Sequence, residues 1–179
     1  MIPLGYMLKT VEGMPEKLAI PGVELVYSLS SHISENFADY IPEWKHNGWG
    51  LFDSPAAVME TAARKGVALD GLTLFYYEAF ASEYDEDDKT WYPIAPKPEF
   101  RTAVTVPAAK TLHGYDVVAY TSGWFPECSP LSCNAVAKDV QTNRFCLLDD
   151  IDAARADLEA GVFDNSEPGP FRLVAVYTV

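Results

Sequence analysis

Two cysteines separated by four residues form the segment of this sequence with the clearest chemical potential. Cys128 and Cys133 lie in "PECSPLSCN", where serine followed by proline is typical of the start of a helix. With Ser129 as the N-cap, the cysteines occupy the two positions that contact each other in a hydrophobic staple. The spacing therefore predicts that the two thiols lie side by side at the beginning of a helix over 129–140.

This pair could be reactive or structural. A thiol near a helix N-terminus is stabilised as thiolate by the helix dipole and by unpaired backbone N–H groups, so Cys133 is a candidate nucleophile or redox thiol with Cys128 as its partner. His46 is the candidate imidazole, because a thiol nucleophile needs a base within hydrogen-bond reach. Glu127 disfavours a thiolate, however, and two cysteines in a staple can serve simply as small buried hydrophobic residues.

A metal site finds little support in the sequence. Zinc would require Cys146 and His113 to join the cysteine pair, and no second closely spaced pair of ligands is present. The acidic run 83–88 does not match a calcium loop, because Thr90 and Pro96 stand where an EF-hand needs glycine and glutamate. We therefore expect no metal and no cofactor.

Tryptophans near an Asn-Gly pair suggest a second kind of site. In "WKHNGWGLF" the residues Trp44 and Trp49 flank Asn47 and Gly48, a pair typical of tight turns. Together with Trp124, these side chains could line a pocket for a small molecule, and Trp44, Asn47, Trp49 and Trp124 are the candidate binding residues. The alternative is that the rings pack around a turn, since aromatic residues also make up large cores.

The net charge limits the classes of partner. A charge of −13 and the lack of any lysine- or arginine-rich run argue against nucleic acid and anionic membranes, whereas such a surface suits a basic protein. No stretch approaches the ~20 apolar residues of a membrane span, and "MIPLGYMLKTVEGM" lacks the features of a signal peptide. With an odd number of cysteines, we expect a cytoplasmic protein with reduced thiols. Nothing in the sequence indicates an oligomeric state.

The pattern of elements predicts one α+β domain over 1–179, since this length is usual for a single core and the sequence shows no internal repeat or linker. Several predicted strands follow one another without helices between them, which favours antiparallel or mixed pairing. We expect a large sheet of about five or six strands with about three helices mainly on one face. Strands are predicted at 3–12, 22–30, 72–84, 101–107, 114–122 and 171–179, helices at 54–66, 129–140 and 149–161, and a helical turn at 34–41.

These observations lead to three functional hypotheses. The first is a non-catalytic acidic domain that binds a protein partner, for example a basic protein. The second is a thiol-dependent enzyme or redox protein that uses Cys133 with Cys128 adjacent. The third is a small-molecule pocket lined by aromatic side chains.

Overall fold

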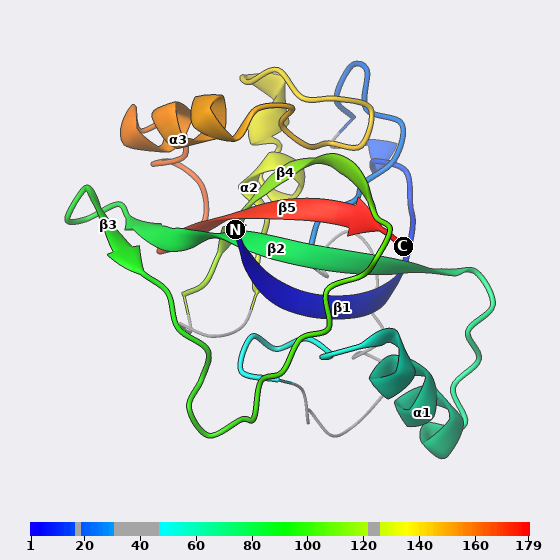
Figure 1. Cartoon of the computed structure of the whole chain (residues 1–179). Helices are drawn as coiled ribbons and strands as arrows, with labels where there is room; N and C mark the ends of the chain where they lie inside the picture. Colours follow the sequence, from blue (N-terminus) through cyan, green and yellow to red (C-terminus); the bar gives the residue numbers. More distant parts are fainter. Residues whose placement is uncertain (17–18, 31–46, 122–125) are drawn as a thin grey trace.

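One antiparallel sheet forms the centre of the protein (Figure 1). The structure is a computed structural model that describes residues 1–16, 19–30, 47–121 and 126–179. Within the sheet the order is β1-β2-β5-β4, and β3 pairs with the outer part of β2. The predicted α+β fold, an antiparallel or mixed sheet of about five or six strands with about three helices, is confirmed, and the sheet has five antiparallel strands. The strands are β1 (Ile2–Thr10), β2 (Leu72–Asp85), β3 (Thr90–Pro93), β4 (Thr111–Ala119) and β5 (Phe171–Thr178).

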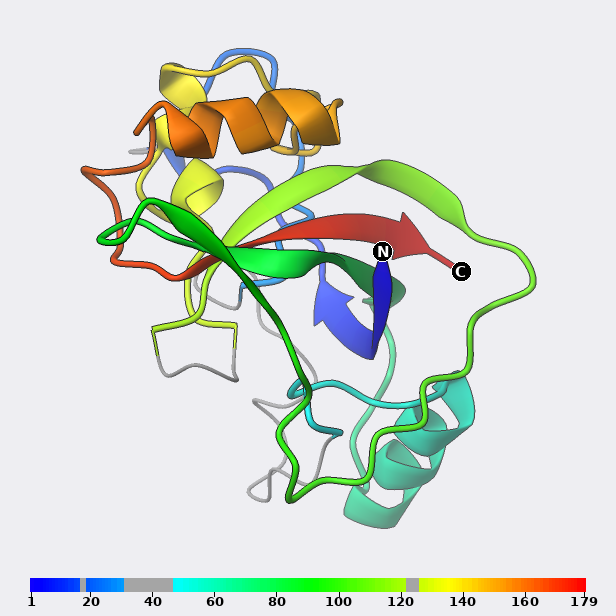
Figure 2. The ribbon, with the colours of Figure 1, turned by 60° about the vertical axis from the view of Figure 1, so that its left-hand side comes forward.

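Two helices, α1 (Pro55–Lys65) and α3 (Ile151–Glu159), lie near opposite ends of the sheet (Figure 2). Ser54 caps α1 by accepting a hydrogen bond from the backbone N–H of Ala57, and Gly66 ends it in a left-handed conformation. Asp150 caps α3 through its carboxylate. The helices predicted over 54–66 and 149–161 are therefore present, each with a capping side chain at its start.

The predicted third helix is shorter than expected and interrupted. The helix α2 (Pro130–Cys133) has only four residues, and a 3₁₀ turn, η3 (Val136–Lys138), follows it. Ala135 separates them with a φ of 57°, a left-handed conformation that stops an α-helix. The Ser-Pro pair thus begins a helical turn here, but the helix does not extend to residue 140.

Two predicted strands are absent from the sheet. Segment 22–30 contributes only an isolated bridge between Val26 and Glu12. Segment 101–107 is bound to Asp53 through the backbone N–H groups of Thr105 and Ala103, at 2.8 and 3.1 Å. Their β-branched content favoured strands, but a strand forms only where a neighbouring edge offers a ladder partner. The predicted turn at 34–41 lies outside the described residues.

A structural repeat, not found in the sequence, relates the two halves of the sheet. The central strands pair at Tyr77 and Val176, and these residues pair in turn with Gly5 on β1 and Gly114 on β4. The halves are therefore related by an approximate two-fold axis through the middle of the sheet. Each half contains an edge strand, a loop, a helix and a central strand: β1, 47–53, α1 and β2 in the first, and β4, 143–149, α3 and β5 in the second.

Asn47 and Asn143 organise the two loops in the same way. The side-chain oxygen of Asn47 accepts two backbone hydrogen bonds within its loop, and its amide nitrogen donates to the carbonyl of Leu4 and to Asp53. Asn143 makes the same four kinds of bond, with its amide nitrogen on the carbonyl of His113 and on Asp149. The loops, "NGWGLFD" and "NRFCLLD", share only an asparagine, a leucine and an aspartate, too few to reveal the repeat in the sequence.

Each loop packs against a glycine of its edge strand. Gly5 and Gly114 have φ angles of 132° and 142°, and each lies at a shift of register in its ladder. A Cβ on Gly114 would lie 2.7 Å from the carbonyl oxygen of Leu148, and one on Gly5 would lie even closer to that of Phe52. Only glycine allows the loop and the strand to approach this closely.

The two faces of the sheet carry different side chains, because successive residues of a strand point to opposite sides. Phe75 and Tyr77 of β2 lie on the first face, where Tyr27 packs edge-on against Phe75. Tyr76 and Glu78 lie on the second face, which α3 and the chain 94–110 cover in part. Arg155 of α3 lies 4.8 Å from the ring centre of Phe80, and Lys110 lies 5.1 Å from that of Tyr76. We call 94–110 the connecting segment.

Candidate functional site

The two candidate cysteines lie on the first face, beside the end of β4. The chain returns along that strand, and the carbonyl of Cys128 accepts a hydrogen bond from the backbone N–H of Ala119 at 2.7 Å. Cys128 is buried, with 2% of its surface exposed, and Cys133 is half-buried. The Cys133 thiol lies close enough to Cys128 to be the largest influence on its pKa, as the spacing predicts, and the Cys128 thiol donates a hydrogen bond to the side-chain oxygen of Asn134 at 3.5 Å.

Ser129 has a different role from the predicted one. Its hydroxyl does not cap α2; instead, it donates a 2.5 Å hydrogen bond to the carboxylate of Asp116 on β4. Ser28 and the backbone N–H of Leu29 donate to the other carboxylate oxygen, each at 3.0 Å. The serine therefore anchors the segment before α2 to the sheet.

Asp116 is the centre of this buried polar cluster. It has no exposed surface, and desolvation raises the pKa of its carboxyl to about 6 in spite of the three hydrogen bonds that favour the charged form. The hydroxyl of Tyr77 is buried nearby and has no hydrogen-bond partner. Asp116 is the charged residue in "GYDVVAY", and a lone carboxylate in an apolar strand is the signal that could have identified it.

Lys9 binds the same stretch of chain from the other edge of the sheet. Its ammonium group, with 1% exposure, donates to the carbonyls of Ser28, Leu29 and Ser30. The Ser28–Ser30 stretch is thus held by a buried lysine from β1 and a buried aspartate from β4. This arrangement fixes the position of the Ser30 hydroxyl, which lies 3.7 Å from the sulfur of Cys133.

The surroundings disfavour a thiolate at Cys128. The hydrogen bond to Cys133, burial and the charge of Cys133 all raise the pKa of the Cys128 thiol, and Glu167 and Asp116 raise it further. Burial also raises the pKa of Cys146 to about 12. Among the described residues, no group of three histidine, cysteine or acidic side chains is placed to hold a metal ion.

The remaining predicted site residues lie in two groups. His46, Trp44 and Trp124 are outside the described residues, so the expected imidazole for Cys133 is not placed. Asn47 and Trp49 are both buried, each with 3% exposure, and Asn47 uses its amide within the loop described above.

Small hollows of the surface repeat beside α1 and α3. One, of about 230 Å³, is lined in part by Phe52, Asp53 and Thr61. Another, of about 300 Å³, is lined in part by Leu148 and Asp149 at equivalent positions of the repeat. Neither of these two is lined by tryptophan or tyrosine, so they differ from the aromatic pocket suggested by the sequence.

A second cluster, missed in the sequence, lies on the opposite face of the sheet. The carboxylate of Glu78 on β2 accepts hydrogen bonds from the hydroxyls of Tyr76 and Tyr177, at 3.1 and 3.0 Å, and from Lys110 at 2.5 Å. We call Glu78, Tyr76 and Tyr177 the tyrosine cage, and Lys110 is the cation that fills it. Burial acts to raise the pKa of Glu78, but the hydrogen bonds from Lys110 and the two tyrosines outweigh it and hold the pKa below its usual value.

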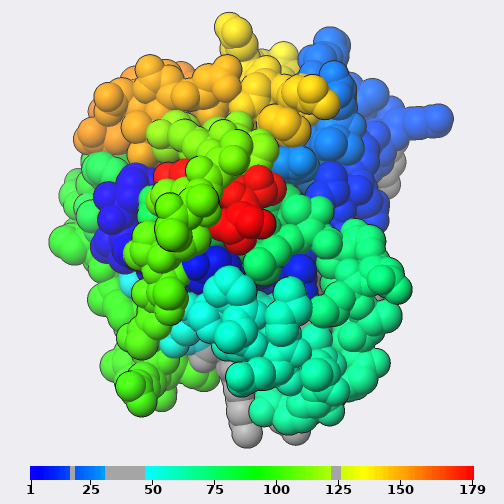
Figure 3. Space-filling model, turned by 45° about the vertical axis from the view of Figure 1, so that its right-hand side comes forward, coloured from blue at the N-terminus to red at the C-terminus, as the bar shows by residue number. Residues whose placement is uncertain are grey.

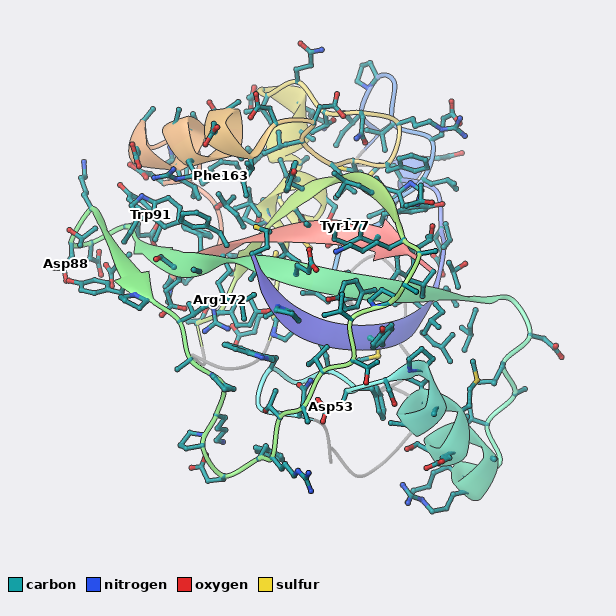
Figure 4. The ribbon with its side chains drawn as sticks, viewed as in Figure 1. Asp53, Asp88, Trp91, Phe163, Arg172 and Tyr177 are labelled. Carbon is teal, nitrogen blue, oxygen red and sulfur yellow. The ribbon has the colours of Figure 1, made fainter. Side chains whose placement is uncertain are left out.

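Acidic side chains gather where the β2–β3 hairpin meets α3. The indole of Trp91 on β3 donates a 2.8 Å hydrogen bond to Glu159 at the end of α3 and lies between the two elements (Figure 4). Burial raises the pKa of Tyr84 first, and the charges of Asp164, Glu159 and Glu86 raise it further. We call this the acidic surface; it consists of Asp85, Glu86, Asp87, Asp88, Glu159 and Asp164.

Comparison with known proteins reveals no relative. No protein-family description, no curated protein and no solved structure matches this chain. Among the described residues, no helix has the length and apolar character to cross a membrane. The function must therefore be inferred from the geometry of these clusters.

Proposed function

We propose that this protein is a non-catalytic domain that binds a basic protein partner through the acidic surface. The observation that carries the proposal is the contact between Trp91 and Glu159, which joins two acidic segments far apart in the sequence into one surface. Asp88 at the tip of the hairpin extends this surface outward (Figure 4). Like charges held together in this way repel each other, and a cationic partner relieves that repulsion.

Aromatic side chains accompany the charges. Tyr92 is 43% exposed and donates its hydroxyl to Asp88 at 2.9 Å. Trp91 is half-buried, with the guanidinium group of Arg155 5.5 Å from its ring centre. Large aromatic residues supply much of the binding energy of protein interfaces, whereas exposed charges mainly accelerate and orient association.

The thiol-dependent alternative has weaker support. The one histidine among the described residues, His113, contacts Tyr27, Phe145 and Thr178 instead of a cysteine. None of the three cysteines forms a disulfide. That state is consistent with a partner met in the cytoplasm, where thiols remain reduced.

The test compares the loss of two acidic charges from the acidic surface with the loss of two acidic charges elsewhere on the protein. The variant D87N/D88N removes two charges from the acidic surface, and E60Q/D70N removes two exposed charges beside α1, at the other end of the sheet. Each protein is immobilised and exposed to extract of the encoding organism, and retained proteins are quantified and then purified to measure Kd. We expect a basic protein whose affinity is reduced at least tenfold by D87N/D88N only and falls as salt rises.

Two outcomes contradict this proposal. In the first, no retained basic protein distinguishes the two variants. In the second, a purified partner binds D87N/D88N and E60Q/D70N equally, which would mean that net charge, and not this surface, drives the association.

A further inference from the structure

The tyrosine cage has the chemistry of an organic-cation site. Tyr76 and Tyr177 are paired across β2 and β5, so both rings and both hydroxyls are held by the sheet. The ammonium group of Lys110 lies 4.1 Å from the ring centre of Tyr177 and 5.1 Å from that of Tyr76. A carboxylate and two aromatic faces around one cation satisfy its charge and replace part of its hydration.

Lys110, the residue that fills the cage, comes from a different part of the fold than the three cage residues. Lys110 ends the connecting segment, which contains no helix or strand, whereas Tyr76, Glu78 and Tyr177 all belong to central strands. The segment crosses this face of the sheet (Figures 1 and 2). Lys110 is an exposed residue, and its side chain is 26% exposed against 12% for that of Glu78. The cage residues therefore belong to the sheet, whereas the cation that fills the cage is more exposed than Glu78 and lies outside any helix or strand.

Hydrogen bonds to Tyr6 and Asp53 tie down the connecting segment a few residues before Lys110. Tyr6 donates its hydroxyl to the carbonyl of Thr105 at 2.5 Å, and Asp53 binds the backbone of Thr105 and Ala103. Beyond these contacts, Val106, with 53% exposure, and residues 108–109 extend into solvent. A shift of 106–110 alone would withdraw Lys110 and leave the other contacts in place.

The cage is also close to the surface. Figure 3 shows the end of β5, in red, open to solvent beside the light green chain that leads into β4. Leu112, two residues after the segment, is 45% exposed. An external group can therefore approach the cage from the side that Lys110 occupies.

We propose that the tyrosine cage binds a primary alkylammonium group, and that Lys110 is an internal occupant which an external amine replaces. The group can come from a free amine or from the lysine side chain of another protein; the chemistry that binds it is the same. This site is on a different surface from the acidic hairpin and does not depend on the partner proposed above.

The test uses the variant K110A, which removes the internal cation and opens its space. Binding of n-butylammonium chloride is measured by calorimetry and by shifts of tyrosine NMR signals at constant ionic strength, with n-butanol as the uncharged probe of the same length. We expect K110A to bind n-butylammonium about tenfold or more tightly than n-butanol, as cation–aromatic and charge-assisted contacts imply. Wild type should bind it at least tenfold more weakly than K110A.

Two further variants separate the contributions. K110A/E78Q removes the carboxylate and should lose the preference for the cation. K110M fills the same space with an uncharged side chain and should block binding while it preserves the fold. Nα-acetyl-lysine methylamide is the second ligand: binding to K110A that equals n-butylammonium identifies a site open to lysine side chains, and exclusion identifies a site for small amines.

The proposal is overturned if K110A, shown to be folded by its thermal transition, binds n-butylammonium no better than n-butanol. It is also overturned if K110A and K110A/E78Q bind the cation equally. Should K110A fail to fold, K110S with the same probes decides between the same outcomes.

Discussion

Replacing Asp116 by asparagine should change how stability depends on pH. Asp116 is completely buried, and desolvation raises its pKa from 3.8 to about 6. A carboxyl with a higher pKa in the folded chain binds its proton more tightly there than in the unfolded chain. Its contribution to stability is therefore fully present below the unfolded pKa and is lost as pH rises through about 6.

The size of this effect follows from the shift. A difference of about two pKa units corresponds to about 3 kcal/mol between the fully protonated and the fully ionised protein. Most of it, about 2 kcal/mol, should be lost between pH 4 and pH 7. In D116N the amide has no charge to desolvate and its oxygen can still accept the hydrogen bond from the backbone of Leu29.

The assay is urea unfolding at constant ionic strength from pH 4 to pH 8. Between pH 4 and pH 7, wild type should lose about 2 kcal/mol more of its unfolding free energy than D116N does. The variant D139N, at an exposed carboxylate, is the control and should parallel wild type. Parallel curves for wild type and D116N would refute the reasoning, because they would show that Asp116 has the same proton affinity in both states.

Two further predictions concern the repeat and the thiols. G114A should lower the unfolding free energy by about 2–4 kcal/mol, because its Cβ would meet the carbonyl of Leu148. G22A is also at positive φ but has open space around it, so it should lower the unfolding free energy by only about 1 kcal/mol. Equal losses for the two variants in thermal unfolding would contradict the steric argument. Iodoacetamide should alkylate Cys133 alone in the native protein, and the two buried cysteines should react only after denaturation. Fast reaction of Cys133 at pH 6, detected by peptide mass, would instead support the thiol-dependent alternative.

Local signals predicted the elements that depend on local chemistry. Ser54 and Gly66 mark α1 in the sequence because capping and left-handed termination involve only neighbouring residues. The break at Ala135 could not be predicted in this way, since alanine in a left-handed conformation must be imposed by the surrounding fold. The contact of Cys128 with Cys133 was predictable from their spacing, and it forms although Ser129 caps nothing.

Sites formed by residues far apart in the sequence were harder to predict from the sequence. The tyrosine cage joins residues of β2 and β5 around Lys110 of the connecting segment, and it depends on a register that pairs Tyr76 with Tyr177. Register is a property of the folded sheet, so no local motif indicates it. The one available signal was Glu78 itself, a charged residue within "LFYYEAF".

The few cations of this chain also bear on its surface charge. Lysine and arginine number 13 against 26 acidic residues, and several of the described cations are bound internally. Lys9 is enclosed by carbonyls, Lys110 fills the tyrosine cage, and Arg172, with 2% exposure, pairs with Glu83 at 2.8 Å. Asp116 and Glu78 are held inward as well, so the internal charges largely cancel. The outer surface therefore keeps the acidic excess that the composition shows, and such a surface suits a basic partner.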